Sequence, residues 1–469
     1  MNEIKFGTDG WRAIIAKEYT IENVSRVAEA VAAWLKQNYN APAALIGYDC
    51  RFGGKMFAEA TAKIMAIRGI KTFLSTGFVS TPMVSLGVVR HKASIGIIIT
   101  ASHNPPDYNG FKLKGEYGGP LLEAQVKEIE EGIEDKITFN PDNVSLENLT
   151  DKGAIEYIDL ETLYCKHIEK NFDLKLIKKS GLKLAYDSMY GAGQNVIRRL
   201  LPDATLLHCV YNPSFGGTAP EPIRRNLAEF EKYIKKAKNL DMGLATDGDA
   251  DRIGLLDGKG RFIDSHNIIL LLINYLVTYK KMTGKVCIAF SVTGKVNKMC
   301  EHFRLPLQVV KVGFKYVCEV MLAEDVLIGG EESGGIAIKG HIPERDGIWI
   351  GLTILEYMAR TGKSLDELIK EVLRITGRFT YLRTDLHLTE QKKQEVLKKC
   401  RENKYTSFGS RKINRVNDLD GFKFYLNEDE WLMIRASGTE PVLRLYAEGS
   451  SAASANAIMN AAIKTIRKD

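Results

Sequence analysis

Three aspartates alternate in the stretch DGDADR, as Asp247, Asp249 and Asp251. In an extended loop, alternate side chains point to one side, so three carboxylates would lie together. Close like charges repel unless a cation lies between them, and an all-oxygen site suits Mg²⁺, Mn²⁺ or Ca²⁺ rather than zinc. An EF-hand is excluded, because Arg252 stands where that loop needs glycine and Gly258 where it needs glutamate. A solvated acidic turn is the alternative, and the apolar run MGLA directly before the aspartates argues against it.

A serine and a histidine, Ser102 and His103, follow a second apolar run, IGIII at 95–99. A hydrolase pair is disfavoured, because neighbouring side chains in an extended segment point apart and no G-x-S-x-G turn is present. Beside a divalent cation, a serine oxygen can instead carry and transfer a phosphoryl group, because the metal neutralises the developing charge. A phosphoserine would also add a fourth oxygen ligand to the three aspartates.

Two further stretches are suited to binding a polar ligand. In GGEESGG, Glu331 and Ser333 stand in glycine-rich backbone that permits close approach, and carboxylate and hydroxyl groups can bind sugar hydroxyls. In RASGTEPVLRLY, arginines and hydroxyls together with backbone N–H groups could cradle a phosphate; the residues are Arg435, Ser437, Gly438, Thr439 and Arg444. An ordinary glycine turn and a surface turn are the alternatives. Together, a metal, a serine, a polyol site and a phosphate site match a phosphorylated sugar.

The elements that must position these residues repeat three times. Each time, a short apolar strand and a helical stretch precede a second apolar strand that ends in polar residues; the paired strands are 43–49 with 95–104, 182–187 with 242–252, and 285–293 with 325–335. Alternating strands and helices predict α/β units with mixed, mostly parallel sheets. The polar tips then lie at the carboxyl ends of strands, where such sheets bind ligands.

The last hundred residues read as an α+β module instead. A β-rich start at 378–388 precedes a Lys/Glu-rich helix at 390–403, and two strands flank RASGTEP before a closing helix at 452–467. We therefore predict three similar α/β domains, 1–150, 151–255 and 256–372, and a C-terminal α+β domain, 373–469, arranged around a central cleft.

Composition indicates the partners that the chain does not need. Over 469 residues the formal net charge is only +7, and no block of Lys and Arg marks a nucleic-acid-binding tail. The longest apolar run, 268–277, is about half of a membrane span and is expected to be a core helix. The seven cysteines are scattered without a C-x-x-C, and the N-terminus has no signal-peptide pattern. We expect a cytoplasmic monomer or homodimer that binds a small phosphosugar and neither nucleic acid nor membrane.

The four motifs together resemble the α-D-phosphohexomutase family, the phosphoglucomutases and phosphomannomutases. TASHNP is similar to the phosphoserine loop, DGDADR to the metal loop, GEESGG to the sugar loop and RASGTEP to the phosphate loop, in the family's order. The resemblance extends over residues 6–446. It implies four domains around a deep cleft.

The resemblance also implies a mechanism. Ser102 would carry a phosphoryl group, pass it to a hexose 1-phosphate, and take back the other phosphate after the hexose 1,6-bisphosphate has turned over. Mg²⁺ would be held by the phosphoserine and the three aspartates. Arg12, Lys112 and Arg252 stand in matching positions around the transferred group, while Glu331 and Ser333 would hold sugar hydroxyls and the RASGTEP loop with Arg444 the other phosphate. His103, Lys112 and Arg12 are candidates for the general acid and base, although arginine accepts protons poorly.

The sugar loop resembles that of phosphoglucomutases. Enzymes for mannose or glucosamine phosphates often end this loop in Gly-His, and Gly335 stands at the position of that histidine. Arg345 stands where phosphoglucomutases commonly have lysine, which keeps the charge but changes the geometry. We expect a phosphoglucomutase, with a phosphomannomutase or phosphoglucosamine mutase as alternatives. A Mg²⁺-dependent sugar phosphatase and a non-catalytic sugar-phosphate sensor are more distant alternatives.

Overall fold

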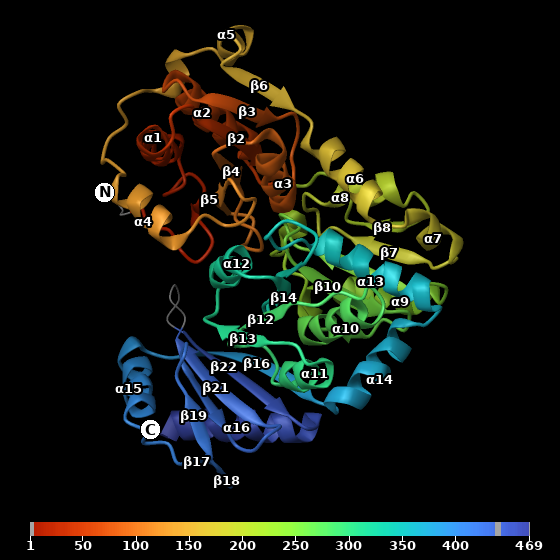
Figure 1. Ribbon diagram of the computed structural model, residues 1–469. Coiled ribbons are helices and arrows are strands. Elements are labelled where there is room, and N and C mark those ends of the chain that lie inside the picture. The colour runs from red at the N-terminus through yellow and green to blue at the C-terminus, as the bar shows by residue number, and fades with distance from the viewer. Residues whose placement is uncertain (1–3, 437–441, 469) are drawn as a thin grey trace.

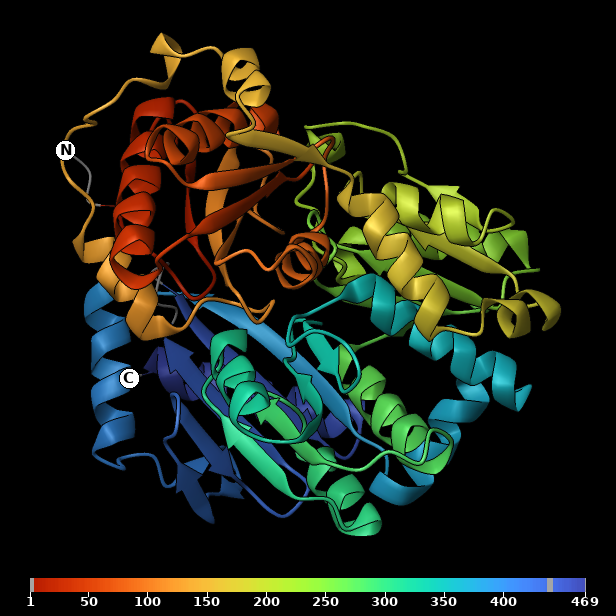
Figure 2. The same ribbon diagram turned by 45° about the horizontal axis from the view of Figure 1, so that its top comes forward.

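Four large sheets follow one another along the described part of the chain, and together they form an arc that is open on the left in Figure 1. The computed structural model describes residues 4–436 and 442–468. Figure 2 shows the same arrangement tilted, with the first and last parts of the chain on the same side of the molecule. We number the domains I to IV by these sheets.

Domain I is built on a six-stranded sheet of order β1-β5-β4-β2-β3-β6, in which β5 runs antiparallel to both of its neighbours and the other strand pairs are parallel. Its strands are β1 (Trp11–Ile14), β2 (Ala43–Tyr48), β3 (Lys71–Ser75), β4 (Ile95–Ile99), β5 (Tyr108–Gly115) and β6 (Ile155–Ile158), and its helices α1 (Ile21–Asn38), α2 (Gly54–Ile67), α3 (Thr81–His91), α4 (Glu123–Glu131) and α5 (Leu146–Asp151). The strand β6 pairs with β3 and lies beyond residue 150. We therefore propose that domain I extends through β6, past the boundary expected from sequence.

Domain II has a five-stranded mixed sheet of order β11-β10-β9-β7-β8. The strands are β7 (Leu184–Asp187), β8 (Thr205–Leu207), β9 (Met242–Thr246), β10 (Ile253–Asp257) and β11 (Phe262–Ile263), and the helices α6 (Leu160–Asn171), α7 (Leu174–Lys179), α8 (Gln194–Leu200) and α9 (Ala228–Ala237). Because β9 and β10 form an antiparallel pair, the aspartate stretch is the connection of a hairpin. We call residues 247–252 the aspartate loop.

Domain III has a four-stranded sheet of order β13-β12-β14-β15. The strands are β12 (Lys285–Ala289), β13 (Leu307–Val310), β14 (Val326–Gly330) and β15 (Ile336–Ile338), and the helices α10 (Ser265–Thr278), α11 (Lys295–Phe303), α12 (Phe314–Ala323), α13 (Gly347–Thr361) and α14 (Leu365–Thr376). The helix α10 contains the longest apolar run and is buried along most of its length, as expected of a core helix. The helix α13 packs on β9 and β10 of domain II. A helix that follows the sheet of domain III therefore covers the sheet of domain II.

Domain IV is an antiparallel sheet of order β16-β22-β21-β20-β19 covered by helices. Its main strands are β16 (Thr380–His387), β19 (Arg415–Asn417), β20 (Phe422–Tyr425), β21 (Trp431–Ala436) and β22 (Val442–Gly449), its helices are α15 (Glu390–Arg401) and α16 (Ala452–Lys468), and β17 (Ser407–Phe408) and β18 (Arg411–Lys412) form a small ribbon. Three α/β domains with mixed sheets and a C-terminal α+β domain are thus confirmed.

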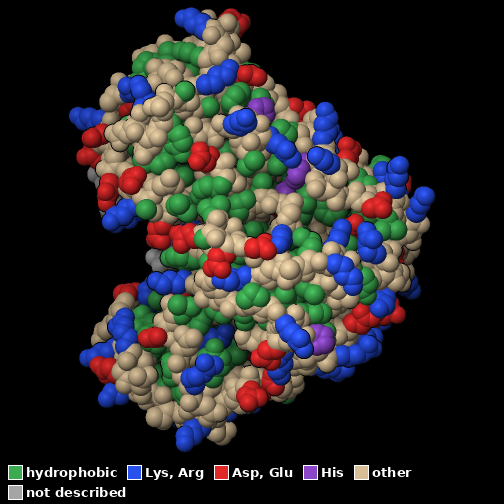
Figure 3. Space-filling view, in the orientation of Figure 1, with side chains coloured by type: hydrophobic (Ala, Val, Ile, Leu, Met, Phe, Trp, Pro, Cys, Tyr) green, Lys and Arg blue, Asp and Glu red, His purple; other side chains and the backbone are tan. Residues whose placement is uncertain are grey.

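The apolar core is continuous through the first three domains and separate in the fourth. One buried cluster joins Leu45 and Val84 of domain I to Leu244 of domain II and Ile269 of domain III, whereas domain IV has a cluster of its own. In the space-filling view, the surface is indented between domain I and domain IV (Figure 3). Among the described helices, none has the length and apolar character that a membrane crossing requires.

Candidate active site

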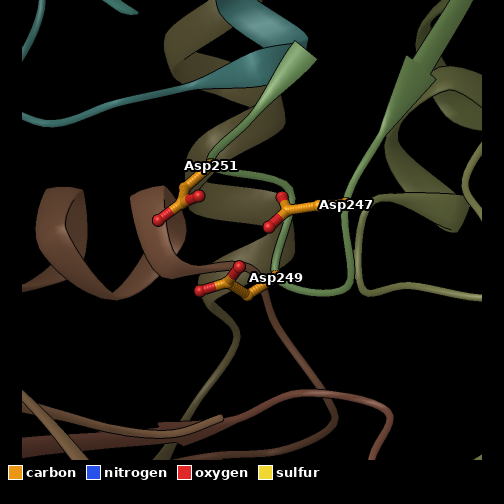
Figure 4. A group of neighbouring side chains, drawn as sticks. All are labelled: Asp247, Asp249 and Asp251. Carbon is orange, nitrogen blue, oxygen red and sulfur yellow. The ribbon is translucent and has the colours of Figure 1, made fainter. Parts of the chain in front are cut away.

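The three aspartates of the aspartate loop converge on one point. All three side chains are buried, and one carboxylate oxygen from each lies within 4.8 Å of the others. Figure 4 shows the carboxylates of Asp247, Asp249 and Asp251 facing a common space. The left-handed conformation of Ala250, with φ 56°, helps the short loop to curl around this space.

Among the described residues, Asp249 and Asp251 each have polar partners on one carboxylate oxygen only. The Oδ2 atom of Asp249 accepts hydrogen bonds from Lys112 (2.7 Å) and Thr81 (2.5 Å), and the Oδ2 atom of Asp251 lies 3.2 Å from Lys112 and 2.7 Å from Arg345. The Oδ1 atoms of both aspartates are buried without a hydrogen-bond partner within the described residues. Buried polar atoms are rarely left unpaired, so these oxygens fit the ligand set of a hard divalent cation.

The local electrostatics also favour a cation. Burial and the charges of Asp249 and Asp251 raise the pKa of Asp247 well above its ordinary value. Burial also acts to raise the pKa of Asp249, but the Lys112 ammonium and its hydrogen bonds hold that pKa below the usual range. A divalent cation among the three carboxylates would relieve the remaining repulsion.

The hydroxyl of Ser102 points at the aspartate loop. Its Oγ atom donates a 2.6 Å hydrogen bond to Asp247 Oδ2, and the side chain is buried. We call residues 100–107, between β4 and β5, the Ser102 loop. A Cβ on Gly248 would lie 2.5 Å from the Ser102 carbonyl oxygen, so only glycine lets the two loops approach this closely.

The geometry of His103 differs from the sequence expectation. An extended segment would turn Ser102 and His103 apart, but Ser102 is left-handed, with φ 53°, and His103 Nδ1 lies 3.4 Å from Ser102 Oγ. Burial, followed by the charges of Arg252, Arg12, Lys112 and Arg51, lowers the pKa of His103 well below its usual value. The imidazole is therefore neutral at neutral pH.

The expected cations lie near Ser102. Arg12, on β1, donates a 2.7 Å hydrogen bond to Asn104 Oδ1 in the Ser102 loop. Lys112 is fully buried on β5, and Arg252 donates its backbone N–H to Asp247 Oδ1 at 3.0 Å. Burial acts to lower the pKa of Lys112, but Asp249, Asp251 and Asp9 overcome that effect and hold it above its ordinary value. The ammonium is a permanent cation at this point.

The GEESGG stretch, which we call the glutamate loop (330–335), adjoins the aspartate loop. Ile253 N donates to Gly334 O at 3.1 Å, and Arg252 and Gly335 form an isolated bridge. Glu331 is buried, and its burial raises its pKa to about 7. Ser333 is partly exposed. The sequence-predicted sugar residues therefore lie beside the predicted metal residues.

Arg345 joins three domains at this site. Its guanidinium contacts Asp9 of domain I and Asp251 of domain II, and lies 3.8 Å from Glu331 of domain III. A Cβ on Gly335 would lie 2.4 Å from Arg345 Cδ. A side chain at 335 and this arginine conformation therefore exclude each other.

Domain IV contributes a pair of arginines. Arg435 on β21 and Arg444 on β22 are direct cross-strand partners. Like charges in this position repel each other, and an anion bound between them would relieve that repulsion. Arg435 Nε donates a 3.0 Å hydrogen bond to Asp420 Oδ2, which also accepts from Val312 N of domain III at 2.8 Å. The predicted phosphate residues Ser437, Gly438 and Thr439 lie outside the described residues.

Sequence reasoning missed two contributors to the site. Asp9 Oδ2 lies 2.8 Å from Lys112 Nζ and contacts Arg345, and it holds these cations together. Thr81, at the start of α3, binds Asp249 through both its hydroxyl and its backbone N–H. The acid inside FGTDGWR was a usable signal for Asp9, whereas Thr81 reaches the site only through the packing of domain I on domain II.

Family models match the chain in four successive stretches. The models for domains I, II and III and the C-terminal domain of phosphoglucomutase/phosphomannomutase match residues 3–139, 162–260, 264–375 and 387–465. The chain therefore belongs to the phosphoglucomutase/phosphomannomutase family of phosphohexomutases, which are isomerases.

Relatives with different names are about equally similar. The chain is 28% identical to a phosphoglucomutase/phosphomannomutase of Thermococcus kodakarensis over 99% of this chain and 98% of that protein. It is also 28% identical to a phosphoglucosamine mutase of Carboxydothermus hydrogenoformans over 99% of each. A crystal structure from Thermus thermophilus, described as a putative phosphomannomutase, superposes with a TM-score of 0.87 at 32% identity and 99% coverage of both chains.

Proposed function

We propose that this enzyme interconverts glucose 1-phosphate and glucose 6-phosphate through a phosphoserine at Ser102 and a glucose 1,6-bisphosphate intermediate. The observation that carries the proposal is the 2.6 Å hydrogen bond from Ser102 Oγ to a cluster of three buried aspartates, two of which keep an unpaired Oδ1 atom among the described residues. A nucleophilic oxygen and a cation site at one point suit phosphoryl transfer.

The metal would be Mg²⁺, held by Asp247, Asp249, Asp251 and an oxygen of the phosphoserine. When bound, it neutralises charge on the transferring group. Lys112, Arg12 and Arg252 supply fixed positive charge around the same point, and the buried position of Ser102 limits access of water to the phosphoester.

In the first half-reaction, the bond from phosphorus to Ser102 Oγ breaks and a bond to the 6-hydroxyl of glucose 1-phosphate forms. In the second, a bond forms from Ser102 Oγ to the phosphorus of the 1-phosphate, the bond from that phosphorus to the sugar O1 breaks, and O1 takes up a proton as glucose 6-phosphate is released. The hydroxyl proton needs an acceptor. Lys112 is a bound ammonium and Arg12 is only a donor, so His103, neutral and 3.4 Å from Ser102 Oγ, is the proposed base.

The other end of the substrate would be held by residues that do not react. Glu331 and Ser333 would bind sugar hydroxyls, and Arg435 and Arg444, with the 437–439 backbone and hydroxyls, would bind the second phosphate. A single phosphate site of this kind can serve both orientations of the bisphosphate, because its two ends exchange places.

Glucose is the proposed sugar because Arg345 packs against Gly335 of the glutamate loop and leaves no room for a side chain at position 335. Relatives named for mannose and glucosamine phosphates make these sugars the competing substrates. The test is kcat/KM for glucose, mannose and glucosamine 1-phosphates in one assay with Mg²⁺ and the matching bisphosphate. We expect at least about tenfold preference for glucose, which corresponds to ~1.4 kcal/mol; an equal or reversed ranking refutes the assignment.

The same assay separates the more distant alternatives. A mutase depends on trace glucose 1,6-bisphosphate and releases negligible inorganic phosphate. Release of one phosphate per glucose 1-phosphate, without glucose 6-phosphate, would identify a phosphatase. A protein that shows no turnover, and no phosphoryl adduct by intact mass after incubation with the bisphosphate, would be a sensor.

A further inference from the structure

A buried arginine lies directly beneath the Ser102 loop. Arg51 follows β2, is 1% exposed, and donates four hydrogen bonds to backbone carbonyls. Its NH1 atom donates to Pro105 O (2.8 Å) and Tyr108 O (3.0 Å), and its NH2 atom to Ser102 O (2.5 Å) and Asn104 O (2.7 Å). One side chain therefore spans the loop from the serine itself to the first residue of β5.

Only arginine has the geometry for this set of contacts. A guanidinium carries its terminal N–H groups in a rigid planar fork, and here all four are directed at carbonyl oxygens of one loop. Lysine has a single nitrogen with three donors and cannot reach four oxygens in different directions. Without Arg51, four carbonyls of the loop would lose this partner, and the loss is most costly at the buried carbonyl of Ser102.

The loop needs this support because Ser102 has an unfavourable backbone conformation. With φ 53°, Ser102 is left-handed, which strains a residue other than glycine unless its surroundings hold it there. Its N–H donates to Thr100 Oγ1 at 2.9 Å, and that hydroxyl donates to Asp49 Oδ2 at 2.5 Å. Asp49 also accepts the Arg51 backbone N–H at 2.9 Å. Asp49 and Thr100 thus hold the N–H of Ser102 while Arg51 holds its carbonyl.

Two residues of domain II pack against Arg51 and the Ser102 carbonyl that it binds. The guanidinium of Arg51 lies 4.9 Å from the ring centroid of Phe215, within the range of a cation–π contact. Gly248 of the aspartate loop packs against the same Ser102 carbonyl that Arg51 binds. Arg51 therefore sets the position of the serine at the surface where domains I and II meet.

We propose that Arg51 is a positioning residue for phosphoryl transfer, which holds Ser102 in the left-handed conformation that directs its Oγ atom at Asp247. The proposal rests on the proposed function. It does not give Arg51 any contact with substrate, because its four terminal N–H donors are used by the loop and its Nε atom lies 3.4 Å from Asp49 Oδ2. Loss of the Arg51 hydrogen bonds should therefore slow both phosphoryl transfers at Ser102 and leave substrate binding by the glutamate loop and domain IV unchanged.

The test compares Arg51→Lys and Arg51→Ala with wild type, and uses Arg26→Ala as the matched control. Arg26 is also a buried arginine of domain I that binds a backbone carbonyl, Glu134 O, but it lies on α1, and its described hydrogen-bond partners are all outside the site. Two quantities are measured: kcat and KM for glucose 1-phosphate, and the rate of Ser102 phosphorylation by glucose 1,6-bisphosphate followed by intact mass. Melting temperatures report the loss of stability alone.

We expect Arg51→Lys to lower kcat and the phosphorylation rate about 100-fold, the size of effect that a displacement of about 1 Å produces, with KM changed less than about threefold. Arg26→Ala should melt earlier but keep kcat within about threefold. If Arg51→Lys, which retains charge and bulk, keeps kcat within threefold of wild type, or if KM alone rises, the positioning role is wrong. A wild-type chain that forms no phosphoserine would refute the proposed function, whatever the variants do.

Discussion

The junction of domains I, II and III differs in kind from the contact between domains III and IV. The first is a continuous apolar core with a buried ionic network. In this network the single side chain of Arg345 contacts residues of three domains. The second is a small cluster, Phe290 with Trp431, Met433 and Tyr446. The proposed reacting groups lie in the first region, and Arg435 of domain IV is linked through Asp420 to Val312 at the second. This division would permit domain IV to move as a unit while the proposed reacting groups keep their geometry.

Several of the polar contacts between domains III and IV are made to domain III backbone. Lys423 Nζ donates to Phe290 O (3.1 Å) and Val292 O (3.4 Å), and Tyr381 donates to Ser291 O at 2.9 Å. Burial lowers the pKa of Lys423 to about 8. This contact is much smaller than the apolar core that domains I, II and III share, and the predictions below test this difference.

The strongest test of the three-domain junction is Ser102→Ala. Without the nucleophile, kcat should fall below about one thousandth of wild type, since no covalent intermediate can form. Affinity for glucose 6-phosphate, measured by calorimetry, should stay within about threefold, because the phosphate and sugar residues lie elsewhere. Turnover above a few per cent would show that another group carries the phosphoryl.

The next test is Asp249→Asn, with Asp257→Asn as its control. Removing one charge from the aspartate loop should lower kcat about 100- to 1,000-fold and raise the Mg²⁺ concentration needed for half-maximal rate. Asp257 is also buried in the same domain but pairs with Arg261, so its variant should keep the Mg²⁺ dependence of wild type. Equal Mg²⁺ curves for the two variants would contradict a metal at the aspartate loop.

A third test concerns the stability cost of the junction. The folded-state pKa of Glu331, about 7, exceeds its unfolded value, so folding binds a proton and stability falls as pH rises from about 4.5 to 7. Glu331→Gln should therefore melt at the same temperature as wild type at pH 4 and higher at pH 8, by the equivalent of ~1–3 kcal/mol. Its kcat/KM should fall because the sugar loses a carboxylate partner. A melting difference independent of pH would mean that the pKa of Glu331 is the same in the folded and the unfolded chain.

The smallest expected effect is on the domain IV side. Asp420→Ala removes the acceptor that orients Arg435 and binds Val312 N. We expect KM for glucose 1-phosphate to rise about tenfold, or ~1.4 kcal/mol, while kcat changes less than threefold, because the group binds a part of the substrate that does not react. A fall in kcat with unchanged KM would instead assign domain IV a part in the chemical step.

Much of this arrangement could be predicted from sequence because the proposed site residues follow strand ends. Ser102 follows β4, the aspartates follow β9 and Glu331 follows β14, and carboxyl ends of strands are where α/β sheets bind ligands. Burial of the apolar strands made the sheets predictable as well. Lys112 was predictable for a related reason, since it lies on the strand that returns from the Ser102 loop.

The remaining features depend on packing that a local pattern does not record. The left-handed conformation of Ser102 brings His103 close, and nothing in a serine's neighbours marks a positive φ. Thr81 and Arg345 meet the aspartates across domain boundaries. Asp420 is separated from Arg435 by 15 residues, and only the pairing of β20 with β21 brings them together.

The crowding of Gly335 against Arg345 makes these two positions a coupled unit for protein engineering. Any side chain introduced at 335 alone would displace the arginine and leave Asp9 and Asp251 short of a cation. Replacement of Arg345 alone by a smaller residue would leave a void beside the glycine. If this corner forms part of the proposed sugar site, we expect a change of sugar preference there to need substitutions at both positions, because each single substitution disturbs the packing of the other residue.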